Sequence, residues 1–191
     1  SSSAQLASEI VQRVHHSWDS GADLVLLPEF TWLALESTLT SQSEQPLQTI
    51  AEVFWNQLFP QIEQQLSRAH KAVVLGTAPA VTKSGDIRNR APIFSEGLFF
   101  YQDKLHLTPW EDFFEPGDVL KIWTLGDFRI AVIICLDIEI PELSARLRDS
   151  KVDLVLCPSA TETILGVERV NRCASARSIE LGCYVGVSHL T

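Results

Sequence analysis

An apolar, mostly β-branched run that ends in a cysteine constrains the fold of this chain most strongly. The stretch FRIAVIICLDIEIPE covers residues 128–142, and its apolar run stops at Cys135. Such a run is typical of a strand buried on both faces, which delivers its last residue to the edge of a sheet. Pro141 and Glu142 suit the first turn of a helix, so Cys135 is predicted at a strand-to-helix elbow. A thiol there is either a small core residue or a nucleophile.

Two other predicted strands also end at a charged side chain. The run ADLVLLPEF shows no polar alternation and indicates a strand buried on both faces, with Glu29 directly after it. The run LFFYQDK ends at Lys104, and the loop that follows contains Glu111. Taken alone, Glu29 is better explained as a solvated loop residue or a helix cap. Because strand ends at one rim of a sheet lie close together, we expect an acid, an ammonium and a thiol to meet there.

The remaining pattern alternates helices and strands. Apolar spacing predicts helices over 4–19, from Pro46 to about 69 with a kink at Pro60, 141–148 and 167–181, the last ending at Gly182. Residues 37–46 are predicted to be a loop and 83–90 a turn region, in which Asn89 anchors the turn. Strands are expected over 72–81, 152–160 and 183–188, with two hairpins that turn at residues 96–97 and 126–127.

Of the other three cysteines, the sequence assigns a structural role only to Cys157. Asp-Leu-Val-Leu occurs at 23–26 and again at 153–156, and Cys157 takes the place that Leu27 has in the first copy. Cys157 is therefore predicted to be a core residue. There is no CxxC pair, and a chain of this size needs no disulfides, so we expect reduced thiols and a cytoplasmic protein.

Composition bounds the class of protein. With 191 residues, 46% of them hydrophobic, the chain is expected to form a single domain over 1–191. The formal net charge of −9 argues against nucleic acid or an anionic membrane as a partner. The histidines share no metal-ligand spacing, so no metal site is predicted. The chain lacks methionine, even at position 1, and we interpret it as truncated at both ends.

The three strand-end groups make a coherent chemistry. A thiol needs a base to become a nucleophile, and Glu29 could take its proton if burial raises the pKa of Glu29. Attack on a carbonyl places negative charge on oxygen, which Lys104 and a backbone N–H after Cys135 could stabilise. We also expect a raised thiolate fraction at Cys135, and therefore fast alkylation near neutral pH.

With these motifs the sequence resembles the nitrilase superfamily of carbon–nitrogen hydrolases. The matching pieces are LLPEF with Glu29, YQDKLHLTPWEDFFEPGD with Lys104 and Glu111, and IICLDIEIPE with Cys135. The segments RNRAPIFSEG and 172–187 resemble the family's approach to its lysine and the helix and strand after its nucleophile strand. The resemblance implies an α/β fold, a four-layer α-β-β-α sandwich with two mixed sheets between helix layers.

The resemblance also implies residue roles and partners. Glu29 would be the general base, Lys104 the stabiliser of the tetrahedral intermediate, Cys135 the nucleophile that forms a thioester, and Glu111 the residue that orients Lys104 and substrate. The substrate would be a small amide or carbamoyl compound, with no metal or organic cofactor, and the protein a homodimer or higher homo-oligomer. Some relatives carry a fused acyltransferase domain, for which the ends of this chain leave room.

Four further residues are candidates for the substrate pocket. Leu136 stands where the family often has an aromatic residue, which predicts an altered pocket shape. Trp110 could line the pocket or pack its loop onto the core, and His106 could bind substrate or hold the loop. Asp137 could rim the pocket or cap the helix that starts at Pro141. Two alternative functions stay open: a catalytically silent assembly or regulatory protein, and nitrile hydrolysis or acyl transfer by the same residues.

Overall fold

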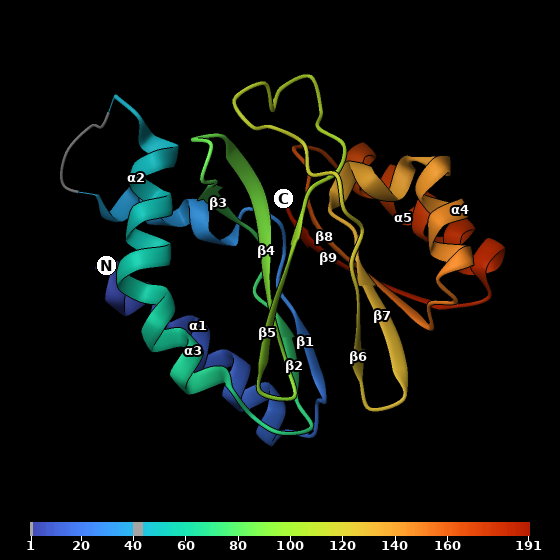
Figure 1. The fold of residues 1–191 in the computed structure, drawn as a ribbon, viewed down its shortest axis with the longest axis horizontal. Coiled ribbons are helices and arrows are strands. Elements are labelled where there is room, and N and C mark those ends of the chain that lie inside the picture. Colours follow the sequence, from blue (N-terminus) through green and yellow to red (C-terminus); the bar gives the residue numbers. More distant parts are fainter. Residues whose placement is uncertain (1, 40–43) are drawn as a thin grey trace.

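Two β-sheets pack face to face, with helices on both outer surfaces (Figure 1). The computed structural model describes residues 2–39 and 44–191. The layers run helix, sheet, sheet, helix, and both sheets contain parallel and antiparallel pairs. The predicted four-layer α-β-β-α sandwich is therefore confirmed.

The first sheet contains five strands. They are β1 (Leu24–Leu26), β2 (Ala72–Val74), β3 (Ala78–Val81), β4 (Ile87–Ser95) and β5 (Leu98–Asp103). β1 runs parallel to β2, whereas β4 is antiparallel to β2, β3 and β5. The predicted hairpin between β4 and β5 is confirmed, and both of its turn residues, Glu96 and Gly97, have positive φ angles.

The second sheet contains four strands in sequence order. They are β6 (Ile122–Leu125), β7 (Phe128–Val132), β8 (Leu154–Ala160) and β9 (Tyr184–Leu190). β6 and β7 form the second predicted hairpin, and β7, β8 and β9 are parallel. β1 has a parallel neighbour in the first sheet, and β7 and β8 have parallel neighbours in the second. Residues that follow the carboxyl ends of such strands can gather at the edge of the sheet.

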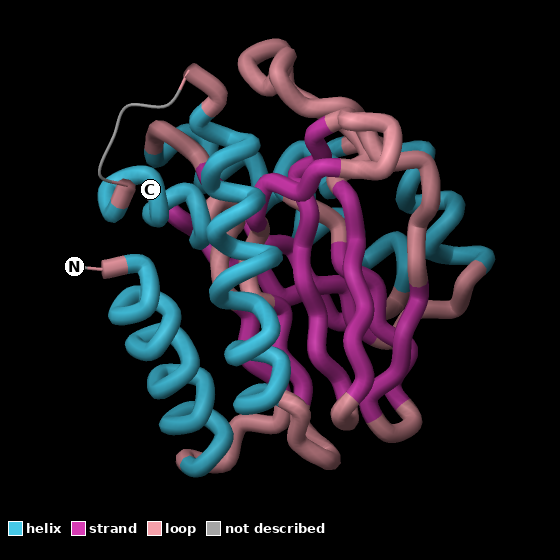
Figure 2. The backbone as a smooth tube through the Cα atoms, turned by 60° about the vertical axis from the view of Figure 1, so that its left-hand side comes forward, coloured by secondary structure: helices cyan, strands magenta, loops and turns pink. Residues whose placement is uncertain are grey.

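Helices cover each sheet on one side only (Figure 2). The first sheet carries α1 (Ser3–Asp19), α2 (Pro46–Glu52) and α3 (Phe59–Leu66), and the second carries α4 (Pro141–Asp149) and α5 (Ile164–Leu181). A π-helical segment, Val53–Leu58, joins α2 to α3. The change in helix geometry that was predicted at Pro60 therefore lies just before that residue, and Pro60 stands in the first turn of α3. Gly182 ends α5 in the left-handed conformation, as predicted. Within the described residues, no helix is long and apolar enough to cross a membrane.

The buried strands alternate between two apolar layers, which explains why their sequences show no polar alternation. Val73 packs under the helices of the first sheet, whereas Val74 packs between the two sheets. In β7, Ala131 faces the helices α4 and α5, and Val132 faces the other sheet. Both faces of these strands are therefore removed from water, as expected for a strand inside a layered sandwich.

Several predicted boundaries were wrong. The run 72–81 forms two strands, because the extended structure is interrupted around Gly76 and Thr77. β1 is covered on both faces as expected, since Leu24 packs between the sheets and Val25 packs under the helices, but it is an edge strand and only half-buried. The region 83–90 is a turn only as far as residue 86, since β4 begins at Ile87. In the predicted loop 37–46, residues 37–38 end a 3₁₀ helix (Thr31–Thr38), and residues 40–43 lie outside the described part.

Candidate active site

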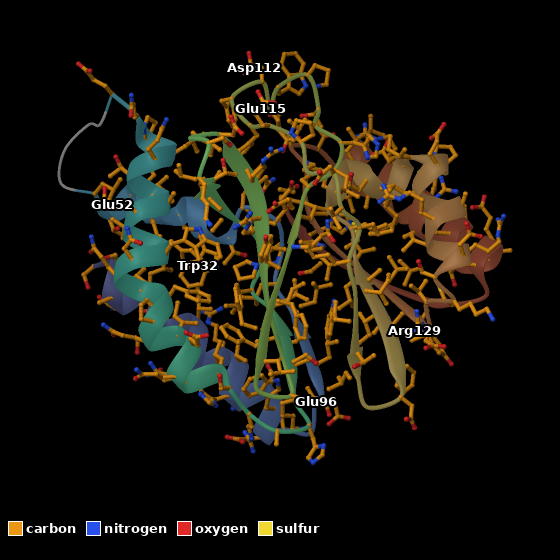
Figure 3. All side chains as sticks on the ribbon, viewed as in Figure 1. Trp32, Glu52, Glu96, Asp112, Glu115 and Arg129 are labelled. Atoms are coloured by element: carbon orange, nitrogen blue, oxygen red, sulfur yellow. The ribbon has the colours of Figure 1, made fainter. Side chains whose placement is uncertain are left out.

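The residues predicted to meet at a sheet rim do meet at one end of the sandwich. Glu29 follows β1, Lys104 directly follows β5, and Cys135 follows β7. The long loop after β5 projects from this end, and Figure 3 labels Asp112 and Glu115 on it. Glu96, in the hairpin turn, marks the opposite end. A cavity of about 500 Å³ lies at that opposite end, beside Glu96, and none of the predicted site residues lines it.

A buried ammonium between two carboxylates forms the centre of the site. Lys104 Nζ lies 2.8 Å from Glu29 Oε1, and 2.9 and 2.8 Å from Glu111 Oε1 and Oε2. The exposed fractions of Lys104, Glu29 and Glu111 are 1%, 0% and 5%. The Thr108 backbone N–H also donates to Glu111. One cation is thus shared by two anions, which leaves the cluster with a net negative charge inside the protein.

The position of Glu29 depends on a close approach at Gly76. Gly76 has a φ of +67°, and a Cβ added there would lie 2.2 Å from the Pro28 carbonyl oxygen. The next residue, Thr77, accepts a hydrogen bond from the Phe30 backbone N–H through its hydroxyl, at 2.8 Å. The interruption between β2 and β3 therefore holds the segment that carries Glu29 against the first sheet.

Cys135 occupies a strained elbow at the start of a 3₁₀ helix (Cys135–Glu139). Its φ of 47° is rare for a residue with a side chain and places it in the left-handed region. Ser159 donates its hydroxyl hydrogen to Cys135 Sγ at 3.3 Å, and the thiol lies 3.4 Å from the Ala160 carbonyl oxygen. Cys135 is 5% exposed, whereas Cys157 is fully buried and belongs to the core, as predicted.

Burial and charge set the protonation of the site. Burial raises the pKa of Glu29, although the nearby Lys104 ammonium opposes the shift. Burial lowers the pKa of Lys104, but Glu29 and Glu111 outweigh burial and hold that pKa above its ordinary value. Lys104 therefore remains an ammonium ion throughout the physiological pH range.

The expectation of a raised thiolate fraction at Cys135 was wrong. Burial and the charge of Glu29 raise the pKa of Cys135 to about 11, against the opposing effect of Lys104. Cys135 is therefore a thiol in the resting protein, and its proton must leave during a reaction. Ala160 bridges the two groups, because its N–H donates to Glu29 Oε2 at 3.0 Å and its carbonyl oxygen lies 3.4 Å from Cys135 Sγ, so Glu29 is the carboxylate placed next to that proton.

Asp137 does not cap α4, and its carboxylate binds backbone N–H groups. Its carboxylate is 0% exposed and accepts hydrogen bonds from the backbone N–H groups of Ile134, Leu105 and His106 at 3.1, 3.2 and 2.8 Å. The residue before α4, Ile140, provides no side-chain cap. Asp137 instead fastens the Cys135 elbow to the segment that follows Lys104.

The other pocket candidates differ in their placement. His106 is held by Asp137, because its Nδ1 lies 2.9 Å from the carboxylate, which matches the predicted role in holding the loop. Trp110 is 83% exposed, so it does not pack its loop onto the core, and its place in the substrate pocket stays a prediction. Leu136 is half-buried beside Cys135. Within the described ranges, no group of three or more His, Cys, Asp or Glu side chains is arranged to hold a metal ion.

Sequence reasoning missed the role of Asn89. This residue lies in β4, not in a turn, and its Nδ2 donates to Glu29 Oε1 at 3.0 Å and to Glu111 Oε1 at 3.4 Å. Strand periodicity could have found it. Asn89 shares a face with Ala91 and Ile93, and both of these pack between the two sheets.

Comparison with known proteins gives one curated relative and several similar folds. "Probable hydrolase YhcX" of Bacillus subtilis (strain 168) is 29% identical over 189 residues, which cover 96% of this chain and 36% of the relative. Nit3 of Saccharomyces cerevisiae, a member of branch 10 of the nitrilase superfamily, superimposes with a TM-score of 0.72 at 20% identity, covering 98% of this chain and 71% of Nit3.

A second fold match concerns an amidase. A mutant of the amidase from Nesterenkonia sp. AN1, which shows the result of Michael addition of acrylamide at the active-site cysteine, superimposes with a TM-score of 0.72 at 17% identity. The match covers 97% of this chain and 72% of the amidase. The chain thus spans about a third of its curated relative and more than two thirds of these two structures.

The family model for carbon-nitrogen hydrolases matches residues 1–189, nearly the whole chain. This match agrees with the four-layer fold and with the order of the glutamate, lysine and cysteine segments along the sequence. The chain belongs to the carbon–nitrogen hydrolase family.

Proposed function

We propose that this protein hydrolyses a C–N bond of a small amide or carbamoyl compound through a thioester on Cys135. In this proposal Glu29 is the general base, Lys104 stabilises the tetrahedral intermediate, and Glu111 orients Lys104. The observation that carries the proposal is the buried contact of Lys104 with both glutamates, beside a thiol on a strained elbow. Membership of a hydrolase family and the resemblance to "Probable hydrolase YhcX" support it.

The first half of the reaction acylates Cys135. The thiol gives its proton to Glu29 as sulfur forms a bond to the carbonyl carbon, and the C=O electron pair moves onto oxygen. Lys104 compensates the negative charge on that oxygen. The intermediate collapses, the C–N bond breaks, and the amine leaves with the proton that Glu29 returns. Since the pKa of Cys135 is raised to about 11, coupling proton transfer to attack avoids forming a free thiolate first.

The second half releases the acid. Glu29 takes a proton from water as the water oxygen attacks the thioester carbon, and Lys104 again faces the oxyanion. The C–S bond breaks, and the sulfur leaves as a thiol after recovering the proton. Both halves use one base, Glu29, and one cation, Lys104.

Two alternatives use the same fold. A catalytically silent assembly protein would not need the Glu29–Lys104–Glu111 cluster, whose burial is costly. Nitrile hydrolysis or acyl transfer to another acceptor would employ the same four residues. These reactions differ from amide hydrolysis in the substrate consumed and in the acceptor of the acyl group, so a substrate panel separates them.

The test is ammonia or amine release from a panel of amides, N-carbamoyl compounds and nitriles. We expect Cys135→Ala and Glu29→Gln each to reduce the rate roughly 10³-fold or more without loss of fold. The matched control is Cys157→Ala, which removes a buried core thiol and should lower stability by ~1–3 kcal/mol while the chemistry persists. Turnover by Cys135→Ala at the wild-type rate would refute the proposal.

Self-association is a separate part of the proposal. Large apolar side chains are exposed on α5 and at the start of β9, including Ile164, Leu165, Ile179 and Tyr184. Pairing of two copies through this face would bury them. Sedimentation analysis of the wild type and of Ile179→Glu tests this, with dissociation of a dimer expected in the variant and an unchanged distribution counting against it.

A further inference from the structure

We infer that Asn89 is a positioning residue that fixes which oxygen of Glu29 receives the proton of Cys135. This inference rests on the proposed function, and it adds to the active site a residue for which the sequence predicted only a role in a turn. Asn89 is 1% exposed and contacts each of the three charged residues of the buried cluster.

The two carboxylate oxygens of Glu29 have different hydrogen-bond donors. Glu29 Oε1 accepts from Asn89 Nδ2 at 3.0 Å and from Lys104 Nζ at 2.8 Å. Glu29 Oε2 accepts from the Ala160 backbone N–H at 3.0 Å. Ala160 also places its carbonyl oxygen 3.4 Å from Cys135 Sγ. Oε2, the oxygen that receives no hydrogen bond from Lys104 or Asn89, is therefore the one held by the residue that contacts the thiol.

The orientation of the amide follows from its neighbours. Two carboxylate oxygens, one from Glu29 and one from Glu111, lie on the Nδ2 side of Asn89. Turning the amide over would place its oxygen against both anions, so only the observed orientation gives favourable hydrogen bonds. A neutral amide can donate to both glutamates without adding a second cation to compete with Lys104 for them.

Stability does not explain an asparagine at this position. Its Oδ1 is buried and has no hydrogen-bond partner among the described residues. A buried polar atom without a partner destabilises a fold, and Ala91 and Ile93 on the same face are apolar. What distinguishes asparagine from an apolar residue here is the N–H pair that faces the two glutamates.

The Asn89 amide is expected to lower the pKa of Glu29. The groups that face Glu29 are Lys104, Glu111 and Cys135, with Asn89 and the Ala160 N–H as neutral donors. Donation to a carboxylate stabilises its ionised form and lowers its pKa. Removal of the amide should therefore raise the pH at which Glu29 becomes a competent base.

The side chain can be removed without disturbing the backbone contact. The Asn89 carbonyl oxygen accepts from the Lys104 backbone N–H at 2.9 Å, and this bond survives any substitution. We choose Asn89→Ala, which removes both donors, and Asn89→Asp, which keeps the shape but places a third carboxyl beside the two glutamates. The control is Ser95→Ala on the same strand, which loses a buried hydrogen bond to the Thr124 carbonyl oxygen.

The measurement is the rate of iodoacetamide labelling of Cys135 from pH 4 to 10, followed by peptide mass spectrometry, with thermal unfolding as a check of folding. In the wild type, a thiol assisted by Glu29 should give a rate that rises with pH and levels off below the pKa of Cys135. We expect the rise to move up by about one pH unit or more in Asn89→Ala and further in Asn89→Asp, but not in Ser95→Ala.

The outcomes separate the inference from the proposed function. A wild-type plateau with an unmoved rise in a folded Asn89→Ala overturns the role of Asn89 and leaves the proposed function standing. Should the alanine variant fail to fold, the same comparison applies to Asn89→Asp. A wild-type labelling rate that climbs tenfold per pH unit without a plateau contradicts base assistance by Glu29. That result would overturn both the role of Asn89 and the proposed function.

Discussion

Lys104 Nζ and Glu29 Oε1 lie 2.8 Å apart, although 75 residues separate them in the sequence and neither side chain is more than 1% exposed. A buried charge without a partner is costly, so Lys104 and Glu29 stabilise each other, and Glu111 is a second partner of Lys104. The pair therefore links the first sheet's edge strand β1 to the strand β5 by charge, and its removal has consequences for stability as well as for chemistry.

The first prediction concerns this pair. Lys104→Met leaves two carboxylates buried without a cation and should lower the free energy of unfolding by about 3–5 kcal/mol. Adding Glu29→Gln removes one of these charges, so the double variant should be more stable than Lys104→Met alone. Urea unfolding of the four proteins in the cycle measures the coupling. Strict additivity of the two single effects would contradict the contact.

The second prediction is a one-sided pH profile for kcat/KM. Glu29 acts as a base only when ionised, and burial raises its pKa, so activity should rise with pH through a limb above the ordinary glutamate value of about 4.3. Lys104 acts as a cation, and its pKa is held above its ordinary value, so no loss should appear before about pH 10. A fall in kcat/KM between pH 7 and 9 would argue against the ammonium role.

The third prediction tests the close approach at Gly76. Gly76→Ala should lower stability by about 2–5 kcal/mol and reduce activity, since the new methyl group would displace Pro28 and with it Glu29. Gly85→Ala is the matched control, because its φ of +92° is also unfavourable for alanine but nothing lies within 4 Å. Equal effects of the two substitutions on thermal unfolding would mean that contact with Pro28 is unimportant.

The fourth prediction concerns Asp137. Asp137→Asn replaces one carboxylate oxygen with an N–H donor that faces backbone N–H groups, and should lower stability by about 1.5–3 kcal/mol. His106→Ala removes only the Nδ1 contact and keeps the backbone contact, so its effect should be smaller, about 1 kcal/mol or less. Chemical denaturation ranks the two variants. A larger loss from His106→Ala would show that the carboxylate does not fasten the elbow to the loop.

The four-layer fold was implied by the resemblance to a known family, whereas the convergence of Glu29, Lys104 and Cys135 could be predicted from local patterns. Continuous apolar runs mark strands buried on both faces, and the residue after each run falls at a rim. The break at Gly76 could not be predicted in this way, since the need for glycine arises from Pro28, far away in the sequence.

The protonation of Cys135 was also beyond the sequence. A strand-end thiol near a lysine suggests a lowered pKa, but the balance depends on burial and on the distance to Glu29, which only the fold supplies. Likewise, Asp137 carries the same charge whether it rims a pocket or binds backbone N–H groups. Its four contacts come from two segments about 30 residues apart.

The central claim is that Cys135 forms the covalent bond to the acyl group. The most direct measurement is intact-mass and peptide mass spectrometry of the protein quenched in acid during turnover of an accepted amide. We predict one added acyl group, located on the peptide that contains Cys135, released by hydroxylamine and absent from Cys135→Ala. Steady turnover with no acyl group on Cys135, or with the acyl group on Cys157, Cys173 or Cys183, would contradict the account.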